Sequence, residues 1–279
     1  MLGLIDWLSL KLLHSWGLRS RWVETSMGTL HVLDGPGRGD LPAVVLLHGL
    51  GARATHFRFV IRNLLPHHQR IIVPDLLGHG LSHVPERFHG GHCTDTAHEA
   101  MLELIDEPVV LFGNSMGGQT AIQFAVRHPE WVARLVVSAP FGVPLDSEDL
   151  QAWLKRFYVD GHDDGIRVIG QTFARKFWWP MRHLMAWGAR RQMNTFTVRN
   201  LLGRASPKDC LDPLDLEGLA MPVLMLWGQE ERIMEEQHLA WFRDHLPAHA
   251  RVERPERYGH SPFLERPRFL ACRIVEAAR

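Results

Sequence analysis

The sequence predicts an α/β domain with a mostly parallel, eight-stranded sheet, helices on both faces and an inserted helical cap. Short apolar runs alternate with longer amphipathic segments, which is the pattern of buried parallel strands joined by covering helices. The alternation stops between residues 138 and 222, where helix-like periodicity replaces the apolar runs. A third observation is a glycine-flanked serine placed directly after one apolar run, which indicates a sharp turn from strand into helix.

The predicted strands are short, rich in Val, Leu and Ile, and bounded by turn-forming residues. In chain order they cover residues 30–33, 43–47, 70–73, 108–112, 135–138, 222–227 and 250–253. The first follows a turn at 27–29 and is expected to pair antiparallel, whereas the runs that follow are apolar enough for buried parallel strands. Helices are predicted between the strands, most clearly at 57–65, 94–105 and 267–278.

The same pattern divides the chain into three parts. Residues 1–20 are predicted to form an apolar helix, residues 21–142 and 213–279 the α/β core, and residues 143–212 the helical cap. Residues 151–210 hold eleven Lys or Arg against four Asp and no Glu, with many aromatic residues. The aromatic residues form either the cap's own core or an apolar lid, and the basic excess either faces solvent or attracts anionic lipid.

Composition excludes several classes of protein. The chain has 279 residues, 46% hydrophobic and 22% charged, with a formal net charge of zero, so nothing in the overall charge indicates nucleic acid binding. Cys93, Cys210 and Cys272 are widely spaced, which predicts no disulfide framework and fits a reducing, cytoplasmic compartment. The 18 histidines include no standard zinc-ligand spacing, so neither a metal nor another cofactor is predicted.

The N-terminal segment is strongly apolar but resembles neither a signal peptide nor a membrane span. It lacks a basic start and a small-residue cleavage site, and its apolar part is too short to cross a bilayer. Met1, Ile5, Leu8, Leu12 and Trp16 would share one helical face. That face either packs on its own domain or lies on a membrane surface. In the second case, residues 1–18 would make a peripheral membrane contact and the protein would be membrane-associated.

Ser115 occupies the most informative position in the chain. The spacing Gly113-x-Ser115-x-Gly117 follows an apolar strand and precedes a helix-forming stretch. Such a turn strains the serine backbone and leaves no room for side chains two residues to either side, which glycine satisfies. The serine would project at the apex, and the following helix dipole favours negative charge beside it.

Four further segments fall at the ends of predicted strands. They are residues 48–51, 75–82, 227–232 and 258–262. Because sites in open α/β sheets form outside the carboxyl ends of the strands, we expect these segments to meet Ser115. The chain order is then a serine, an acidic residue and a histidine, which is the order of one particular catalytic triad architecture.

With these residues in view, about residues 25–279 resemble the α/β-hydrolase superfamily. Residues 113–118 and 259–267 look most like serine esterases and monoacylglycerol-type lipases. They are also similar to serine hydrolases that cleave carbon–carbon bonds in ring-fission products, although those usually have Trp where this chain has Ser261. Their oxyanion loop is also richer in glycine than Leu50-Gly51-Ala52. The serine at position 115 argues against the related dehalogenases and epoxide hydrolases, which use an aspartate nucleophile.

The resemblance implies a role for each residue of the site. Ser115 would be the nucleophile, His260 the base and Glu231, four residues after Trp227, the triad acid. The family usually has Asp at this place, and the adjacent Glu230 stays open as the alternative acid. The backbone N–H groups of Leu50 and Met116 would bind the substrate oxyanion. His48 would hold the oxyanion loop, and Asp75 and His79 would stabilise a turn.

We therefore expect a cofactor-free serine hydrolase that acts on a small-molecule ester through an acyl-enzyme. Short- or medium-chain acyl esters and monoacylglycerols are the expected substrates. Two alternatives stay open, a carbon–carbon bond hydrolase of ring-fission products and a non-catalytic α/β-hydrolase-like binding protein. The sequence leaves the oligomeric state undetermined.

Overall fold

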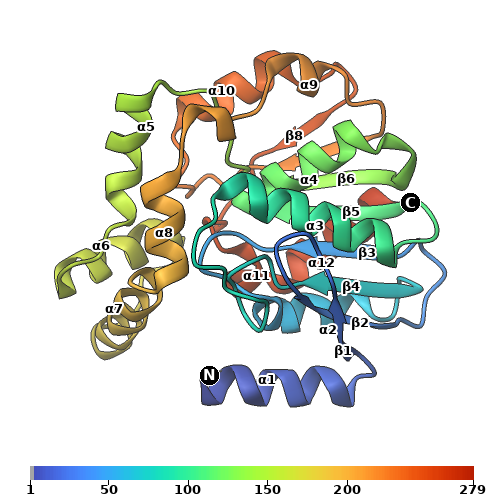
Figure 1. The fold of residues 1–279 in the computed structure, drawn as a ribbon, viewed down its shortest axis with the longest axis horizontal. Helices are drawn as coiled ribbons and strands as arrows, with labels where there is room; N and C mark the ends of the chain where they lie inside the picture. Colours follow the sequence, from blue (N-terminus) through green and yellow to red (C-terminus); the bar gives the residue numbers. More distant parts are fainter. Residues whose placement is uncertain (1–2) are drawn as a thin grey trace.

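The computed structural model describes residues 3–279 and is built on one eight-stranded sheet (Figure 1). The strands are β1 (Arg19–Val23), β2 (Leu30–Pro36), β3 (Val44–Leu47), β4 (Arg70–Pro74), β5 (Val109–Asn114), β6 (Val132–Ser138), β7 (Val223–Leu226) and β8 (Arg251–Glu253). Their order across the sheet is β1-β2-β4-β3-β5-β6-β7-β8. β2 pairs antiparallel with β1 and β4, and all other neighbours pair in parallel.

This architecture confirms the predicted fold class, and each predicted strand has a counterpart. β1 is not among the predicted strands. Its residues, Arg19–Val23, contain little apolar side chain and are mostly exposed. As an edge strand β1 pairs only with β2, and Trp22 is 56% exposed. A strand that buries so little lacks the apolar run by which the other strands are recognised.

Helices cover both faces of the sheet. They are α1 (Leu4–Ser15), α2 (Arg58–Leu64), α3 (Gly90–Leu104), α4 (Met116–Arg127), α5 (Ser147–Leu154), α6 (His162–Thr172), α7 (Trp179–Met193), α8 (Phe196–Arg204), α9 (Pro213–Glu217), α10 (Glu236–His245), α11 (Pro262–Glu265) and α12 (Pro267–Ala278). Side chains of β3 alternate between the two cores: Val44 and Leu46 pack with α2 and α12, whereas Val45 and Leu47 pack with α3 and α4.

Helices α5 to α8 lie between β6 and β7 in the chain and gather beside the sheet, to the left in Figure 1. We refer to them as the cap. Within the cap, α6 and α7 pack closely, since a Cβ atom on Gly165 would lie 2.5 Å from the Ala186 carbonyl oxygen. Glycine at this position therefore allows the two helix backbones to touch.

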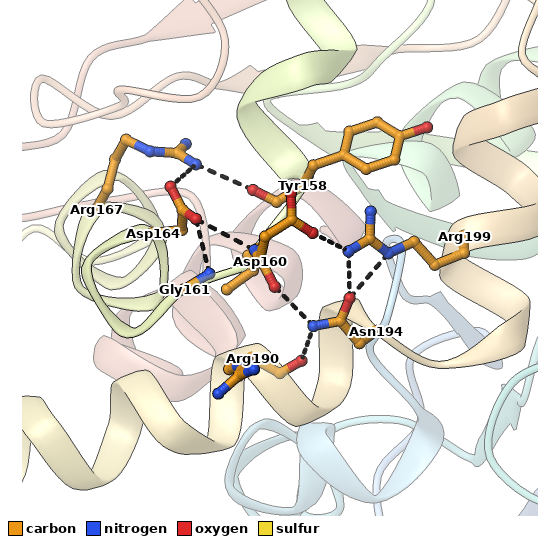
Figure 2. Close-up of polar contacts among 9 residues, drawn as sticks. Tyr158, Asp160, Gly161, Asp164, Arg167, Arg190, Asn194 and Arg199 are labelled. Atoms are coloured by element: carbon orange, nitrogen blue, oxygen red, sulfur yellow. Dashed lines mark hydrogen bonds and ion pairs between the residues drawn. The ribbon is translucent and has the colours of Figure 1, made fainter.

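A polar network fixes the ends of these cap helices relative to one another (Figure 2). Arg199 of α8 forms an ion pair with Asp160 at 2.7 Å and donates through Nε to Asn194 Oδ1 at 2.8 Å. Asn194, which follows α7, donates to the Val159 carbonyl at 2.6 Å. Asp164 accepts the Gly161 amide at 2.9 Å and so caps α6. The network joins α6, α7 and α8 into one unit.

Helix α1 is attached to the core through polar residues. Asp6 accepts hydrogen bonds from Arg53 Nη1 at 3.0 Å and from Thr55 Oγ1 at 3.1 Å. Ser9 and Leu13 are the buried residues of this helix. The inward face of α1 is therefore largely polar at its N-terminal half.

The opposite face of α1 is apolar and points to solvent. Ile5, Leu8 and Leu12 are 71%, 52% and 38% exposed, so of the two alternatives left open for this face, packing on its own domain does not hold for these three residues. Trp16 does pack against the core, and Met1 lies outside the described residues. Asp6, which interrupts the apolar run in the sequence, is the residue that decides which side of the helix turns inward. Within residues 3–279, no helix is both long and apolar enough to cross a membrane.

Candidate active site

The turn at Ser115 has the strained geometry that the glycine spacing predicts. Ser115 joins β5 to α4 with φ 56° and ψ −121°, a region that L-residues rarely occupy. A Cβ atom on Gly113 would lie 2.2 Å from the Gly117 carbonyl oxygen, and one on Gly117 would lie 2.4 Å from the Leu47 carbonyl oxygen. Both distances are far inside van der Waals contact, so only glycine fits either position.

Backbone hydrogen bonds hold Ser115 in this conformation. Its amide donates to the Ser138 carbonyl of β6 at 3.0 Å, and its own carbonyl accepts the amides of Gly118 at 2.8 Å and Phe141 at 3.1 Å. The surrounding structure thus over-determines the strained residue, which is how such strain persists. The Ser115 side chain lines a cavity that His260 also lines.

Glu231 and His260 are brought into direct contact. His260 Nδ1 lies 2.9 Å from Glu231 Oε2, and the Glu231 side chain is only 2% exposed. Glu231 Oε1 accepts the amides of Ile233 at 2.8 Å and Met234 at 3.0 Å. A carboxylate can only accept a hydrogen bond, so Nδ1 of His260 carries the proton and donates to Glu231. Nε2 of the imidazole is then free to accept a proton from a neighbouring group.

Glu230, the alternative acid, has a different partner. Its Oε2 accepts the Tyr258 amide at 3.0 Å, two residues before His260. Glu230 therefore fixes the backbone of the histidine loop, whereas Glu231 contacts the imidazole itself. The geometry favours Glu231 as the acid of the triad.

The two expected oxyanion donors lie on either side of Ser115. Met116 is the first residue of α4, and Leu50 follows β3 in a loop that reaches Ser115, since a Cβ on Gly49 would lie 3.0 Å from Ser115 Cβ. Among the described residues, neither amide donates a backbone or side-chain hydrogen bond. Both N–H groups are thus available for an oxygen beside Ser115, and the α4 N-terminus favours negative charge there.

His48 holds the loop that contains Leu50. Its Nε2 accepts the Leu76 amide at 3.0 Å, so the proton must lie on Nδ1, which donates to the Gly49 carbonyl at 2.9 Å. The imidazole is fully buried, and this desolvation lowers the pKa of His48 to about 3. His48 is therefore a neutral structural residue, as the resemblance implied.

Asp75 and His79 support the same loop from the next strand. His79 Nε2 accepts the Gly51 amide at 3.1 Å, and burial lowers the pKa of His79 to about 4. Burial alone would raise the pKa of the Asp75 carboxyl, but its hydrogen bond with His31 at 2.9 Å, the charges of the neighbouring imidazoles and the Ala54 amide together outweigh burial and lower it. Asp75 also accepts the Ala54 amide at 2.7 Å. The expected turn-stabilising roles thus have physical partners.

The cavity beside Ser115 has a volume of about 260 Å³ and is lined mainly by apolar side chains. Leu50 and Met116 line it from the core, and Trp153, Phe157 and Phe173 line it from the cap region. Part of the cap's aromatic content therefore covers the site, while Trp178, Trp179 and Trp187 are exposed instead. The sequence left open whether the aromatic residues form the cap's own core or an apolar lid, and could not identify which of them face inward.

The cap is bonded directly to the loop that carries His260. The Thr172 carbonyl, at the end of α6, accepts the amides of His260 at 2.9 Å and Ser261 at 3.3 Å. Glu265 accepts the amides of Ala174 at 3.0 Å and Arg175 at 3.1 Å. Sequence reasoning missed both residues, because each acts on a segment about ninety positions away in the chain.

The remaining ionisable residues suggest no metal chemistry. Cys93, Cys210 and Cys272 are free thiols, and burial raises the pKa of Cys93 to about 12. In the part of the chain that the structure describes, no group of three His, Cys, Asp or Glu residues is arranged to hold a metal ion.

Comparisons with known proteins agree with this geometry. A family model described as the alpha/beta hydrolase fold matches residues 42–267. The chain is 25% identical to a pimeloyl-[acyl-carrier protein] methyl ester esterase of Nitrosospira multiformis, over 86% of this chain and 96% of that protein. It is 26% identical to the solved structure of a 2-hydroxy-6-oxo-6-phenylhexa-2,4-dienoate hydrolase from Rhodococcus, with a TM-score of 0.76 over 93% and 98% of the two chains. A Bacillus subtilis carboxylesterase structure matches at 19% identity with a TM-score of 0.74, covering 99% of this chain and 97% of its own.

Substituting Glu265 with Gln should loosen the histidine loop. The change removes a carboxylate that accepts two amides, and charge-assisted bonds of this kind are each worth about 1.5–3 kcal/mol. We expect hydrogen–deuterium exchange at the His260 and Ser261 amides to become at least about tenfold faster. Glu256→Gln, an exposed substitution nearby, is the matched control. Unchanged exchange in Glu265→Gln would show that the cap does not hold this loop.

Acidification should destabilise the protein well before its carboxylates are protonated. Burial lowers the pKa of His48 to about 3 and the pKa values of His79 and His98 to about 4. The unfolded chain binds protons at these residues below pH ~6.5 while the folded chain does not, so stability falls as pH falls from about 6.5 to about 4.

In that window, each of the three imidazoles makes the free energy of unfolding fall by up to about 1.4 kcal/mol for each pH unit of acidification. Urea unfolding between about pH 7 and pH 5 measures the combined slope. His98→Gln should remove the contribution of one proton from this slope. His98 is suited to the test because it is buried and its one side-chain hydrogen bond among the described residues is to the Thr120 carbonyl at 3.0 Å. Stability that stays level as the pH falls would contradict this account.

Proposed function

The chain belongs to the α/β-hydrolase family, and from this premise we propose that it is a serine hydrolase that cleaves carboxylic esters. One observation carries the proposal. Ser115, held at a strained apex, lines the same cavity as His260, whose Nδ1 contacts the buried carboxylate of Glu231 at 2.9 Å. These are the nucleophile, base and orienting acid that acyl transfer requires.

In the first half of the reaction, Ser115 Oγ attacks the ester carbonyl carbon and His260 Nε2 accepts the hydroxyl proton. Glu231 keeps the proton on Nδ1 and stabilises the imidazolium that forms. The amides of Leu50 and Met116 donate to the oxyanion, and loss of one such donor costs about 3 kcal/mol in other enzymes. The imidazolium then protonates the leaving alcohol as the acyl-enzyme forms.

In the second half, water enters where the alcohol has left. His260 Nε2 takes a proton from this water, whose oxygen attacks the acyl carbonyl. Collapse of the second tetrahedral intermediate releases the acid and returns the proton to Ser115 Oγ. No step needs a cofactor, because every proton moves between the substrate, water and the imidazole.

The shape of the cavity supports short- or medium-chain acyl esters, including monoacylglycerols. Its volume of about 260 Å³ lies near the lower limit of ligand pockets, which commonly span ~300–1,000 Å³. Its aromatic and aliphatic walls suit an acyl chain and offer few partners for charged groups. The similarity to an esterase that acts on a methyl ester is consistent with a small leaving group.

Carbon–carbon bond hydrolysis of ring-fission products is the second candidate function. The similarity to the Rhodococcus hydrolase, which is named for a dienoate substrate, is the observation that favours it. Ser261 follows the histidine here, where those hydrolases usually have Trp, and this favours ester cleavage instead. A non-catalytic binding protein is a third possibility, which the assembled Ser115, Glu231 and His260 disfavour.

A panel of p-nitrophenyl esters of increasing acyl length tests this proposal. We expect release of p-nitrophenol that is greatest for short or medium chains and falls by at least about 10³-fold in Ser115→Ala. A ring-fission dienoate added to the panel tests the second candidate. Turnover of the dienoate without turnover of any ester would replace the proposed activity, and no Ser115-dependent turnover at all would favour a binding protein.

The two adjacent glutamates provide a matched control on the best ester of the panel. Glu231→Gln leaves the imidazole without its carboxylate and should lower kcat by several orders of magnitude, as about 10⁴-fold is lost on such a change in serine proteases. Glu230→Gln should have a small effect, because Glu230 bonds only the backbone of Tyr258. Loss of turnover confined to Glu230→Gln would reverse the assignment of the acid.

A further inference from the structure

The outward face of helix α1 has the opposite character from the exposed face of an ordinary surface helix. Asp6 and Ser9 turn toward the protein, while Leu4, Ile5 and Leu8 are 72%, 71% and 52% exposed. A helix that only packed on its own domain would bury these apolar side chains and expose the polar ones. The chain instead uses polar contacts to hold α1 and leaves the apolar stripe free.

Helix α7 of the cap is built in the same way. Trp179, Leu184 and Trp187 are 73%, 63% and 58% exposed, and Trp178 directly before the helix is 69% exposed. The buried residues of α7 are only Ala186 and Met193. Large aromatic side chains that stay exposed on one element mark an interaction surface more often than they occur by chance.

One arginine joins the two helices. Arg53 donates through Nη1 to Asp6 of α1 and through Nη2 to Gln192 of α7, each at 3.0 Å. Figure 1 places both helices along the lower side of the molecule, α1 below the sheet and α7 below α8. The two helices are therefore linked through Arg53, and we call their residues 4–12 and 178–191 the α1–α7 surface.

The charge on the α7 part of this surface is of one sign. Residues 175–191 contain no Asp or Glu. Their five basic residues, all exposed, are Arg175, Lys176, Arg182, Arg190 and Arg191. Tryptophans flanked by Arg and Lys suit the interface of an anionic bilayer, where the rings enter the headgroup layer and the cations meet lipid phosphates.

The charge also argues against a second copy of the chain as the occupant. A two-fold interface places the same patch on both partners, so two basic α7 segments would face each other without acidic partners. An anionic lipid surface neutralises the same residues. The apolar and basic groups thus fit a bilayer better than they fit themselves.

Helix α7 also forms part of the cavity wall. Ala189, Gln192 and Met193 of α7 line the cavity beside Ser115, and Gln192 donates to the Gly51 carbonyl in the oxyanion loop at 2.7 Å. The exposed aromatic residues and the site therefore lie on the two sides of one helix.

We propose that the α1–α7 surface docks the protein on an anionic lipid bilayer, so that α7, which also lines the cavity, contacts the membrane. Docking depends on the exposed tryptophans and basic residues of α7 together with the apolar stripe of α1. It does not depend on the chemistry at Ser115, so binding and hydrolysis can be tested apart.

Sedimentation with vesicles tests the proposal, with Ser115→Ala protein used throughout so that no lipid is hydrolysed. We expect binding to vesicles of phosphatidylcholine and phosphatidylglycerol in equal parts, and weaker binding to phosphatidylcholine alone. Trp179→Gln with Trp187→Gln, or Ile5→Gln with Leu8→Gln, should weaken binding by about tenfold or more. Arg182→Gln with Arg191→Gln should weaken binding roughly tenfold on the anionic vesicles only.

Leu214→Gln is the matched control, since Leu214 is 72% exposed on α9, at the opposite side of the molecule in Figure 1. It should bind as the parent protein does, and far-ultraviolet circular dichroism confirms that each variant is folded. No binding to anionic vesicles, or equal binding by the α7 tryptophan variant and Leu214→Gln, would overturn the proposal. So would a dimer in solution that the tryptophan variant abolishes, because a second copy would then cover the surface.

Discussion

The strained backbone at Ser115 is the constraint on which the rest of the site depends. With φ at 56°, the residue is stable only because β6 accepts its amide and the chain after β6 donates to its carbonyl. Glycines at 113 and 117 follow from the same constraint, since neighbouring backbone atoms would lie within 2.5 Å of any Cβ there. The parallel order β3-β5-β6 places these supports on both sides of the serine.

In the proposed triad, glutamate in place of the more common aspartate changes how the acid is held. The longer side chain of Glu231 has one more rotatable bond to fix, and its Oε1 accepts the amides of Ile233 and Met234 in its own loop. The other oxygen then points at His260. The same loop lies against α6, because Arg232 donates to the carbonyls of Gly170 and Phe173. The acid and the base are thus both positioned partly by the cap.

Local sequence patterns made much of the fold and of the candidate site predictable. Features that depend on contacts between distant parts of the chain were not predictable. The strands and the turn at Ser115 are visible because apolar runs and glycine spacing reflect local demands on the backbone. Local patterns do not distinguish Glu230 from Glu231, because adjacent residues differ only in which distant group each one reaches, and only the family resemblance favoured Glu231. The orientation of the apolar face of α1 was left open for a similar reason. Its orientation depends on Asp6 meeting Arg53, forty-seven positions away.

Active-site labelling measures the central claim most directly, namely that His260 and Glu231 activate Ser115 and no other serine. A fluorophosphonate reacts only with a serine whose hydroxyl is deprotonated by a neighbouring base as it attacks. Intact-protein and peptide mass spectrometry should show a single adduct, on the peptide that carries Ser115, with labelling strongly slowed by loss of the His260 imidazole. Unmodified protein, or an adduct at any other residue, would contradict the account.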